Sequence, residues 1–235
     1  VLAYKHTEVH KKAEQLEKAA ALLRAEILKS VLPSISEYSW ENDSLIFAFK
    51  IPEPRPLVSL LIPTRDGLSI LQPCVESILE KTTYENFEIL ILDNQSQKSE
   101  TLTWLKTIQS DPRVKVLQYD YPFNYSAINN FGVQHAQGSI IGLINNDVEV
   151  ISANWLTEMV AHACRAEVGC VGAKLYYSNG QIQHAGVILG LGHVAGHAHR
   201  FAIRDSTGYF NRLKLLQGYS AVTGACLLVR REIYE

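Results

Sequence analysis

Pro56-Leu-Val-Ser-Leu-Leu-Ile-Pro-Thr-Arg-Asp66 is the stretch that decides the fold of this 235-residue chain. Val58 to Ile62 is a continuous apolar, β-branched run, which is typical of a strand buried on both faces. A helical pattern follows, with Ser69 as a candidate cap and an end near Glu80. Phe87 to Leu92 then forms a second apolar run. A strand, a helix and a strand in this order predict parallel pairing.

The same alternation continues along the chain. We expect helices over Thr101 to Ile108, Ser126 to His135 and Ala153 to Ala166, and strands over Val114 to Gln118, Ile140 to Ile144 and Ala225 to Val229. The fold class is therefore predicted to be α/β, a Rossmann-like, mostly parallel sheet with helices on both faces. After Ala166 glycines become frequent and Ser178-Asn179-Gly180 predicts a hairpin turn, so this half should be less regular.

Residues 1–56 are predicted to form a separate N-terminal region. From Lys5 to Lys29 the apolar residues recur in steps of 4 and 3, which predicts a helix with one apolar seam. The seam consists of Val9, Ala13, Leu16, Ala20, Leu23 and Ile27. Packing on its own domain and binding a partner helix both fit this pattern. Ser44 to Lys50 alternates like a strand, and three prolines then form a stiff linker, so the main domain should begin near Leu57.

Composition narrows the functional classes. The chain carries 22 Lys and Arg against 24 Asp and Glu, a net charge of -2, which offers neither a broad basic field for nucleic acid nor a polybasic tract for a membrane. No apolar run approaches the roughly 20 residues of a spanning helix, and no signal peptide is recognisable. The four scattered cysteines are typical of reduced thiols in a cytosolic protein. Val1 and a helix-like opening at the last residues indicate a piece of a longer polypeptide.

Polar residues follow three of the predicted strands. They are Thr64-Arg65-Asp66, Asp93-Asn94-Gln95-Ser96 and Asn145-Asn146-Asp147. Because parallel strands end at the same edge of a sheet, we expect these segments to lie together, where ligands of such sheets bind. Amides and carboxylates can hold a base and a ribose, and Asp147 can hold a divalent cation that bridges a diphosphate. The sequence therefore predicts a pocket for a nucleoside diphosphate.

Four ordered segments resemble landmarks of family two glycosyltransferases. They are Pro56 to Asp66, Glu88 to Ser96, Phe123-Asn-Tyr-Ser-Ala-Ile-Asn-Asn-Phe-Gly132 and Leu143 to Glu149. The resemblance covers roughly Pro56 to Glu235 and is nearest to bacterial, often rhamnosyltransferase-like members that build O-antigen and other surface polysaccharides. It implies an inverting enzyme of the GT-A fold. Residues 57–150 would be the nucleotide-binding half, and residues 151–235 an incomplete acceptor-side half.

The resemblance also implies roles for single residues. Nucleotide contacts fall on Thr64, Arg65, Asp66, Asp93, Asn94, Asn130 and Asn146. Asn94 stands where many relatives have a second aspartate, which is compatible with a UDP or dTDP sugar donor. Asn145-Asn146-Asp147 matches the Asp-x-Asp metal motif, so Asp147 alone would offer a carboxylate to Mg²⁺ or Mn²⁺. Few protein ligands suffice for such ions when phosphates and waters complete the shell.

The implied reaction is a single displacement at the anomeric carbon, with a glycan or lipid-linked glycan as acceptor, in the cytoplasm or at the inner face of the membrane. The metal would offset charge on the departing diphosphate, and a carboxylate would take the acceptor's proton. In the family that base follows the segment resembling Thr223 to Arg231, so we expect it beyond residue 235. Candidate acceptor or loop contacts are Trp155, His184, His197, Thr223 and Gly224.

Other interpretations remain open. Gly190-Leu-Gly192-His-Val-Ala195 satisfies a dinucleotide fingerprint, but no helical pattern follows it. His193, His197 and His199 could suggest a zinc site or a loop over the pocket. A nucleotidyltransferase would need a first loop richer in glycine and arginine than residues 64–67. A domain kept for docking, held to a partner through the helix of residues 5–29, is the non-enzymatic alternative.

Overall fold

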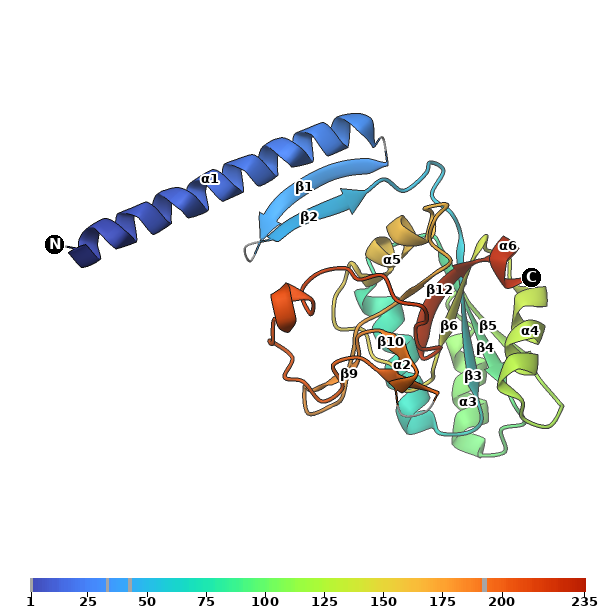
Figure 1. Ribbon diagram of the computed structural model, residues 1–235. Coiled ribbons are helices and arrows are strands. Elements are labelled where there is room, and N and C mark those ends of the chain that lie inside the picture. The colour runs from blue at the N-terminus through green and yellow to red at the C-terminus, as the bar shows by residue number, and fades with distance from the viewer. Residues whose placement is uncertain (1, 33, 42–43, 192–193) are drawn as a thin grey trace. The chain divides into compact units, whose positions relative to one another are not determined.

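A computed structural model describes residues 2–32, 34–41, 44–191 and 194–235 (Figure 1). The chain divides into two compact units. The first unit runs to Lys50 and includes Thr207–Gln217, and the second comprises Ile51–Ser206 and Gly218–Glu235. The sequence predicts a boundary near Leu57 and does not anticipate the return of Thr207–Gln217 to the first unit. That return depends on long-range contacts such as the 3.3 Å hydrogen bond from Asn211 Nδ2 to Ser44 Oγ, which local patterns do not reveal.

The first unit consists of a helix, a hairpin and a short 3-10 turn. Helix α1 (Leu2–Val31) precedes strands β1 (Ile35–Glu41) and β2 (Ser44–Phe49), which pair antiparallel. The turn η2 spans Tyr209–Asn211. The helix and the second strand agree with the prediction, whereas β1 was not predicted. No helix among the described residues combines the length and apolar character needed to cross a bilayer.

The apolar seam of α1 is not the face that packs on the hairpin. Ala25 is the buried residue of this helix, and the Tyr38 hydroxyl on β1 donates to the Glu26 carboxylate at 2.7 Å. The seam residues Leu16 and Leu23 are instead 71% and 66% exposed. The side chains of Val9 and Ala13, which open the seam, lie outside the described part of the chain. The helix therefore packs on its hairpin with one face, and its apolar seam lies on another, exposed face.

The second unit is built on one six-stranded sheet with the order β5-β4-β3-β6-β12-β7. Its strands are β3 (Val58–Thr64), β4 (Phe87–Asp93), β5 (Val114–Gln118), β6 (Ile140–Ile144), β7 (Cys170–Gly172) and β12 (Cys226–Arg230). Strands β3 to β6 pair parallel, while β12 pairs antiparallel with both β6 and β7. The predicted mostly parallel sheet is confirmed.

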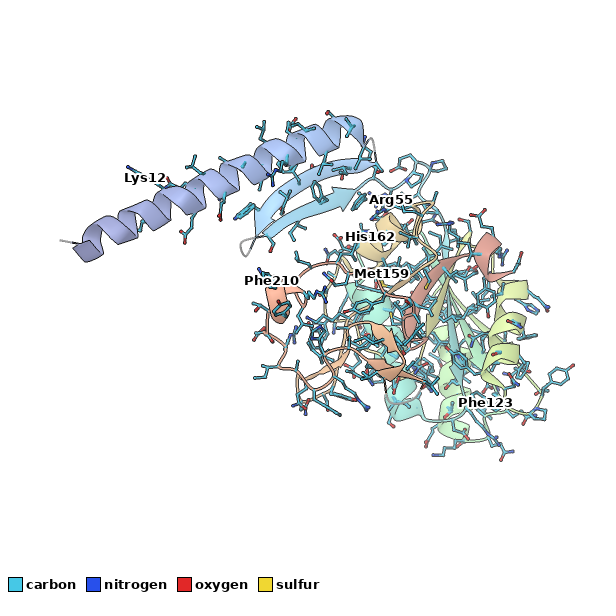
Figure 2. All side chains as sticks on the ribbon, in the orientation of Figure 1. Lys12, Arg55, Phe123, Met159, His162 and Phe210 are labelled. Carbon is cyan, nitrogen blue, oxygen red and sulfur yellow. The ribbon has the colours of Figure 1, made fainter. Side chains whose placement is uncertain are left out.

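Helices cover both faces of this sheet (Figure 1). They are α2 (Leu68–Lys81), α3 (Ser99–Ile108), α4 (Tyr125–His135), α5 (Trp155–Ala163) and the short α6 (Arg231–Tyr234). Because side chains alternate along a strand, Leu60 and Ile62 of β3 pack with α2, α3 and α5, whereas Leu61 packs with α4. Met159, labelled in Figure 2, belongs to the first of these two cores.

Two helix ends differ from the sequence prediction for physical reasons. Ser69 does not cap α2, because the chain enters that helix through Gly67 in the left-handed region at φ 66°. Helix α5 ends at Ala163 and not at Ala166. There the Arg230 guanidinium donates to the carbonyls of Ala163, Arg165 and Val168 at 2.7–3.0 Å, and so satisfies groups that a longer helix would bond internally.

The second half carries two small hairpins. One pairs β8 (Leu175–Tyr176) with β9 (Ile182–His184), and the other pairs β10 (Val187–Leu189) with β11 (Ala195–His197). The predicted turn at Ser178-Asn179-Gly180 is confirmed, since the Gly180 amide donates to Tyr177 O at 2.9 Å. Gly192 and His193 of the dinucleotide fingerprint lie outside the described residues. Strands flank them where that fingerprint requires a helix.

A buried polar network closes the edge where β3 and β4 begin. Glu88 on β4 is 7% exposed, and its Oε1 accepts from the Ser59 hydroxyl at 2.7 Å and from the Gln137 amide at 2.6 Å. Its Oε2 lies 3.1 Å from Lys115 Nζ, and the Gly138 amide donates to Ser59 Oγ. Burial raises the pKa of Glu88, but these hydrogen bonds outweigh it and hold the pKa below its usual value.

We predict that Glu88→Gln lowers the free energy of unfolding by about 1–3 kcal/mol at neutral pH, because it replaces an acceptor of several donors by an amide. The folded pKa lies below the unfolded one, so the carboxylate's contribution is complete above about pH 4.3 and is lost as the pH falls through the folded pKa. Urea unfolding at pH 7 and pH 3 measures both effects. Glu85→Gln, at an exposed position, is the control, and equal stabilities of the two variants would contradict the prediction.

We predict that Leu16→Asp changes the thermal midpoint little, because the seam is exposed, whereas Ala25→Asp destabilises the first unit by placing a charge in its buried contact. Differential scanning calorimetry of both variants makes the comparison. A large loss for Leu16→Asp would show that the seam is covered within this chain. An unchanged midpoint leaves the seam available to a partner helix.

Candidate functional site

The carboxyl ends of the parallel strands and the start of β12 form one edge of the sheet. Thr64 at the end of β3 pairs with Asp93 at the end of β4, and Ile144 at the end of β6 pairs with Cys226 at the start of β12. Neighbouring strands lie about 4.8 Å apart, so this edge spans about 14 Å from β4 to β12. The sheet therefore assembles the three predicted polar segments with Thr223 and Gly224.

Thr64 joins the ends of β3 and β6. Its side chain is buried, and its Oγ1 accepts a hydrogen bond from Asn146 Nδ2 at 3.1 Å. Asn145 opens a tight turn in which the Val148 amide donates to its carbonyl at 3.3 Å, and its own amide donates to Ala225 O at 2.9 Å. Asp147 stands exposed in that turn. The strand pairing and these contacts fix the backbone of the turn and leave the Asp147 carboxylate toward solvent.

Asp66 ties two loops together. Its backbone is left-handed at φ 50°, and its amide donates to Ser96 Oγ at 2.7 Å. Its Oδ1 accepts from the amides of Gln97 and Lys98 at 3.0 and 2.9 Å, just before α3. The Lys98 amide is the largest influence that lowers the pKa of Asp66. Asp66 thus ties the loop after β3 to the segment that leads into α3. One oxygen of this carboxylate is thus used within the protein, while its neighbour Arg65 is exposed, and the nucleotide contacts of both stay predictions.

Asp93 and Asn94 bury acceptor atoms that have no hydrogen-bond partner among the described residues. Both side chains are at most 1% exposed. Asp93 Oδ1 accepts from the Ser96 amide at 3.1 Å, whereas its Oδ2 has no partner. Asn94 Nδ2 donates to Tyr119 O and Tyr121 O at 3.1 and 2.8 Å, whereas its Oδ1 has no partner. A buried acceptor left unpaired costs about 1–3 kcal/mol, so these atoms call for N–H or O–H donors from outside the protein.

Helix α4 carries a third such acceptor, on a residue that the sequence did not single out. Asn129 is 1% exposed, its Nδ2 donates to Tyr125 O at 2.8 Å, and its Oδ1 has no partner in the described structure. The predicted Asn130 is exposed and accepts from the Tyr234 hydroxyl at 2.9 Å. Asn129 could have been found from helical spacing. It precedes Gly132 by three positions, and a Cβ on Gly132 would lie 2.8 Å from Leu92 Cδ1 on the sheet.

On the β12 side, Tyr125 and the residues before the strand come together. The Tyr125 hydroxyl donates to Gly224 O at 3.0 Å, and Thr223 Oγ1 accepts from the Ala225 amide at 3.3 Å. Trp155 is placed elsewhere. Its Nε1 donates at 3.0 Å to Oγ1 of Thr82, which follows the end of α2 farthest from the polar edge, and its ring packs against the core. The predicted acceptor contact of Trp155 therefore has no support in this structure.

His184 is an internal hydrogen-bonding residue. It is 1% exposed, and its Nε2 accepts from the amides of Gly186 and Thr223 at 3.3 and 3.4 Å. Its Nδ1 must then carry the hydrogen and donate to His197 Nδ1 at 2.8 Å. Burial first, and the neighbouring His197 second, lower the pKa of His184 to about 4. His184 therefore holds Thr223 in place as a neutral ring, and its predicted contact with donor or acceptor stays a prediction.

The oxygen donors at the end of β6 suit a hard cation such as Mg²⁺ or Mn²⁺ when a ligand brings phosphates. Asp147 supplies an exposed carboxylate. Asn146 bonds Thr64 through its Nδ2, so its side-chain oxygen is left as a second oxygen ligand. Within the described residues no three His, Cys, Asp or Glu side chains gather into a metal site. The three-histidine zinc interpretation is thus unsupported, with His193 outside the described residues. The residues fit a cation held mostly by its ligand's phosphates.

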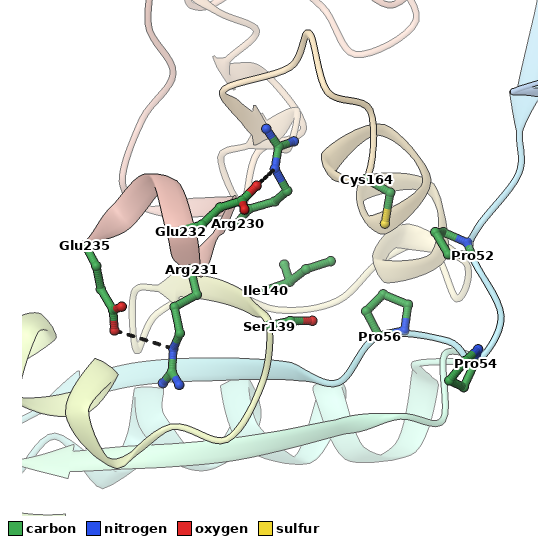
Figure 3. A pocket seen from close by; sticks show the side chains of 10 residues that line it. All are labelled: Pro52, Pro54, Pro56, Ser139, Ile140, Cys164, Arg230, Arg231, Glu232 and Glu235. Atoms are coloured by element: carbon green, nitrogen blue, oxygen red, sulfur yellow. Dashed lines mark hydrogen bonds and ion pairs between the residues drawn. The ribbon is translucent and has the colours of Figure 1, made fainter.

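A separate pocket of about 520 Å³ lies at the opposite edge of the sheet (Figure 3). Its walls include Pro56 before β3, Ile140 at the start of β6 and Arg230 at the end of β12. The two arginines there already serve the fold. Arg230 bonds the carbonyls that follow α5, and Arg231 donates to Val133 O and Ala136 O at the end of α4, both at 2.6 Å. Arg231 keeps its buried Nε without a hydrogen-bond partner in the described structure, 3.7 Å from Glu235 Oε1.

Comparisons with known proteins point to one family. The model of glycosyl transferase family 2 matches residues 59–235. The chain is 57% identical over 184 residues to the uncharacterized protein y4gI of Sinorhizobium fredii, covering 78% of this chain and 20% of that protein. It is 40% identical over 181 residues to the O-antigen biosynthesis protein RfbC of Myxococcus xanthus, covering 77% and 14%. The chain thus spans a fifth or less of the length of these two relatives.

A solved structure supports the fold. The structure of GalNAc-T7 with UDP, GalNAc and Mn²⁺ superimposes with a TM-score of 0.61 at 18% identity, covering 85% of this chain and 39% of that one. The predicted GT-A fold is thereby confirmed. At this level of identity the likeness concerns the fold and not the ligands.

We predict that the imidazole of His184 titrates with a pKa of about 4, because burial and then the neighbouring His197 disfavour the charged ring. A second proton on Nε2 would also break the hydrogen bonds that it accepts from two amides. The folded pKa lies below the unfolded value of about 6.5, so stability should rise with pH between these values and level off above them. Imidazole ¹⁵N–¹H correlation spectra across pH 3.5–8 measure it, and His184→Gln assigns the signal. A pKa near 6.5 for this ring would contradict the hydrogen-bond arrangement.

Proposed function

Because the chain belongs to glycosyl transferase family 2, we propose that it binds a nucleoside-diphosphate sugar at the carboxyl edge of its sheet and transfers the sugar to a glycan acceptor. One observation carries the proposal. Among the described residues, the buried acceptors Asp93 Oδ2, Asn94 Oδ1 and Asn129 Oδ1 have no hydrogen-bond partner, and they lie at the end of β4 and on α4. The N–H groups of a base and the hydroxyl groups of a ribose are donors that would satisfy them.

We assign the donor to the UDP or dTDP class. Uracil and thymine each present one ring N–H, and the ribose of the donor presents hydroxyl groups, so the base and the ribose together can satisfy a pair of buried acceptors. Asp93 and Asn94 supply that pair. The GalNAc-T7 structure, which shares the fold, holds UDP and Mn²⁺. RfbC, the Myxococcus xanthus relative, is named for O-antigen biosynthesis, which supports a cell-surface glycan as the acceptor.

The order of groups along the edge suggests how the reaction is arranged. The base and ribose would lie at β4, the diphosphate at the turn after β6, and the acceptor beside Thr223 and Gly224 before β12. A divalent cation at Asp147 would supply positive charge that stabilises the departing diphosphate. The acceptor hydroxyl would form its bond to the anomeric carbon as the bond to the diphosphate oxygen breaks, so that configuration inverts. Its proton would pass to a carboxylate base.

The protein's own contribution is to hold these groups before the donor arrives. Thr64, through Asn146, fixes the end of β3 against the turn that carries Asp147. His184 fixes the Thr223 amide, and Tyr125 fixes the Gly224 carbonyl. A site positioned by such contacts needs little rearrangement when the donor binds, which is the main source of rate enhancement available from geometry.

We predict that UDP or dTDP binds this chain in the presence of Mn²⁺ and that Asp93→Asn and Asp147→Ala each weaken binding at least tenfold. Asp93→Asn removes the charge beside the base, and Asp147→Ala removes the one carboxylate at the turn. Isothermal titration with UDP, dTDP and GDP, with and without Mn²⁺, measures both effects. Asp205→Asn is the matched control, since Asp205 is exposed and far along the chain from these segments.

Comparing the titrations with and without Mn²⁺ distinguishes the roles of Asp93 and Asp147. Asp93→Asn should weaken binding with or without Mn²⁺, whereas Asp147→Ala should abolish only the increment that Mn²⁺ adds. Failure of the unaltered protein to bind any of the three nucleotides would overturn the donor site. Binding that neither substitution changes would move the site away from this edge.

A further inference from the structure

We propose that the loop between β5 and α4 is the stacking platform for the nucleobase, with the rings of Tyr121 and Phe123 as its surface. This inference rests on the proposed donor site and adds the residues that bind the face of the base. Residues 119–124, here called the aromatic loop, hold three aromatic side chains, of which Tyr119 is buried and the other two are open. Figure 2 shows Phe123 at the outer margin of the domain.

The aromatic loop is tied directly to the unpaired acceptors. Asn94, whose Oδ1 lacks a partner, uses its Nδ2 to hold the carbonyls of Tyr119 and Tyr121 at 3.1 and 2.8 Å. The Tyr119 amide donates to Asp93 O at 2.9 Å. A base whose edge meets Asp93 and Asn94 therefore lies one side chain away from the Tyr121 backbone. We place the rings of this loop against the face of that base.

Both ends of the aromatic loop are fixed, so its rings are carried on an ordered support. At the first end, the buried Tyr119 ring packs against Phe131 of α4 and against Tyr121, with ring centroids 5.4 and 5.3 Å apart. At the other end, the Asn124 side chain accepts from the Ala127 amide at 3.0 Å and caps α4. An anchored aromatic loses little freedom when a ligand stacks on it.

The exposure of the Tyr121 and Phe123 rings supports a role in binding a ligand. Tyr121 and Phe123 are 64% and 65% exposed, although Tyr119 and Phe131 beside them are packed. The loop after β3, on the other side of Asp93, offers Arg65, Asp66 and Gly67 and no aromatic ring. Every nucleobase has an apolar π-face, and stacking on an aromatic side chain is worth about 1–3 kcal/mol per base. The aromatic loop supplies that group next to Asp93 and Asn94, whereas the open ring of Tyr125 on α4 lies beside Asn129 and is bonded to Gly224 O.

Stacking and edge recognition predict different effects on selectivity. A ring binds the face that all bases share, whereas Asp93 and Asn94 bind the edge that distinguishes them. Loss of the rings should therefore weaken UDP, dTDP and GDP by similar factors. It should leave inorganic pyrophosphate, which has no base, unaffected.

The test is titration of the full chain with these three nucleotides and with pyrophosphate, all in the presence of Mn²⁺. We expect Tyr121→Leu and Phe123→Leu together to weaken nucleotide binding roughly 10- to 100-fold. Tyr121→Trp should restore it in the Phe123→Leu background, because indole keeps a π-surface. The control is Tyr209→Leu with Phe210→Leu, an exposed Tyr and Phe pair of the first unit at 74% and 79% exposure.

The outcomes separate this proposal from the donor site itself. If the unaltered protein binds nucleotide and the double variant binds it equally well, the stacking platform is wrong and the donor site stands. If pyrophosphate weakens as much as the nucleotides, the loop acts on the phosphates and the platform is likewise overturned. If the unaltered protein binds pyrophosphate but no nucleotide, the donor site fails and the platform fails with it. Both substitutions lie at exposed positions, and circular dichroism checks that the variants fold.

Discussion

The central position of β3 is the constraint on which the rest of the second unit depends. Because β3 pairs parallel with β4 on one side and with β6 on the other, the three strands must end together. The antiparallel addition of β12 then brings the start of a fourth strand to the same edge. Residues separated by more than 150 positions, from Thr64 to Gly224, become neighbours along one line. Fixing one register therefore assembles a site that no local segment contains.

The polar residues at this edge divide into two groups with different physical roles. Asp66, Ser96, Asn146 and His184 use their polar atoms on other loops, and they hold the edge in shape. Asp93, Asn94 and Asn129 each use one polar atom in this way and leave another unpaired. The second group thus serves the fold and a ligand at once. A substitution there should change binding more sharply than stability, because one partner is lost inside the protein and one outside it.

Local patterns were enough to predict the sheet and most of its elements, because an apolar run of five to seven residues between polar turns has few alternatives. They failed where a distant group decides the outcome. Arg230 ends α5, Asp66 bonds the segment before α3 from another loop, and Asn211 bonds Ser44 in the first unit. The site was predicted as a set of segments, but not which side chains are buried. The buried Asn129 was not singled out, and the burial of the His184 ring was not predicted.

The contrast between the two ends of β3 and β4 argues for the site independently of any relative, whereas just after β12, at the other edge, Arg231 Nε is a buried donor without a hydrogen-bond partner in the described structure. Where β3 and β4 begin, Glu88 and Ser59 form a buried network in which the Glu88 carboxylate oxygens and the Ser59 hydroxyl are hydrogen-bonded. Where the same strands end, the buried Asp93 and Asn94 keep acceptors without partners in the described structure. At either end of these strands, a buried polar group without a hydrogen-bond partner is energetically costly. An edge that leaves them unpaired is stabilised when a ligand completes them, and this makes the carboxyl edge the place where binding and folding are linked.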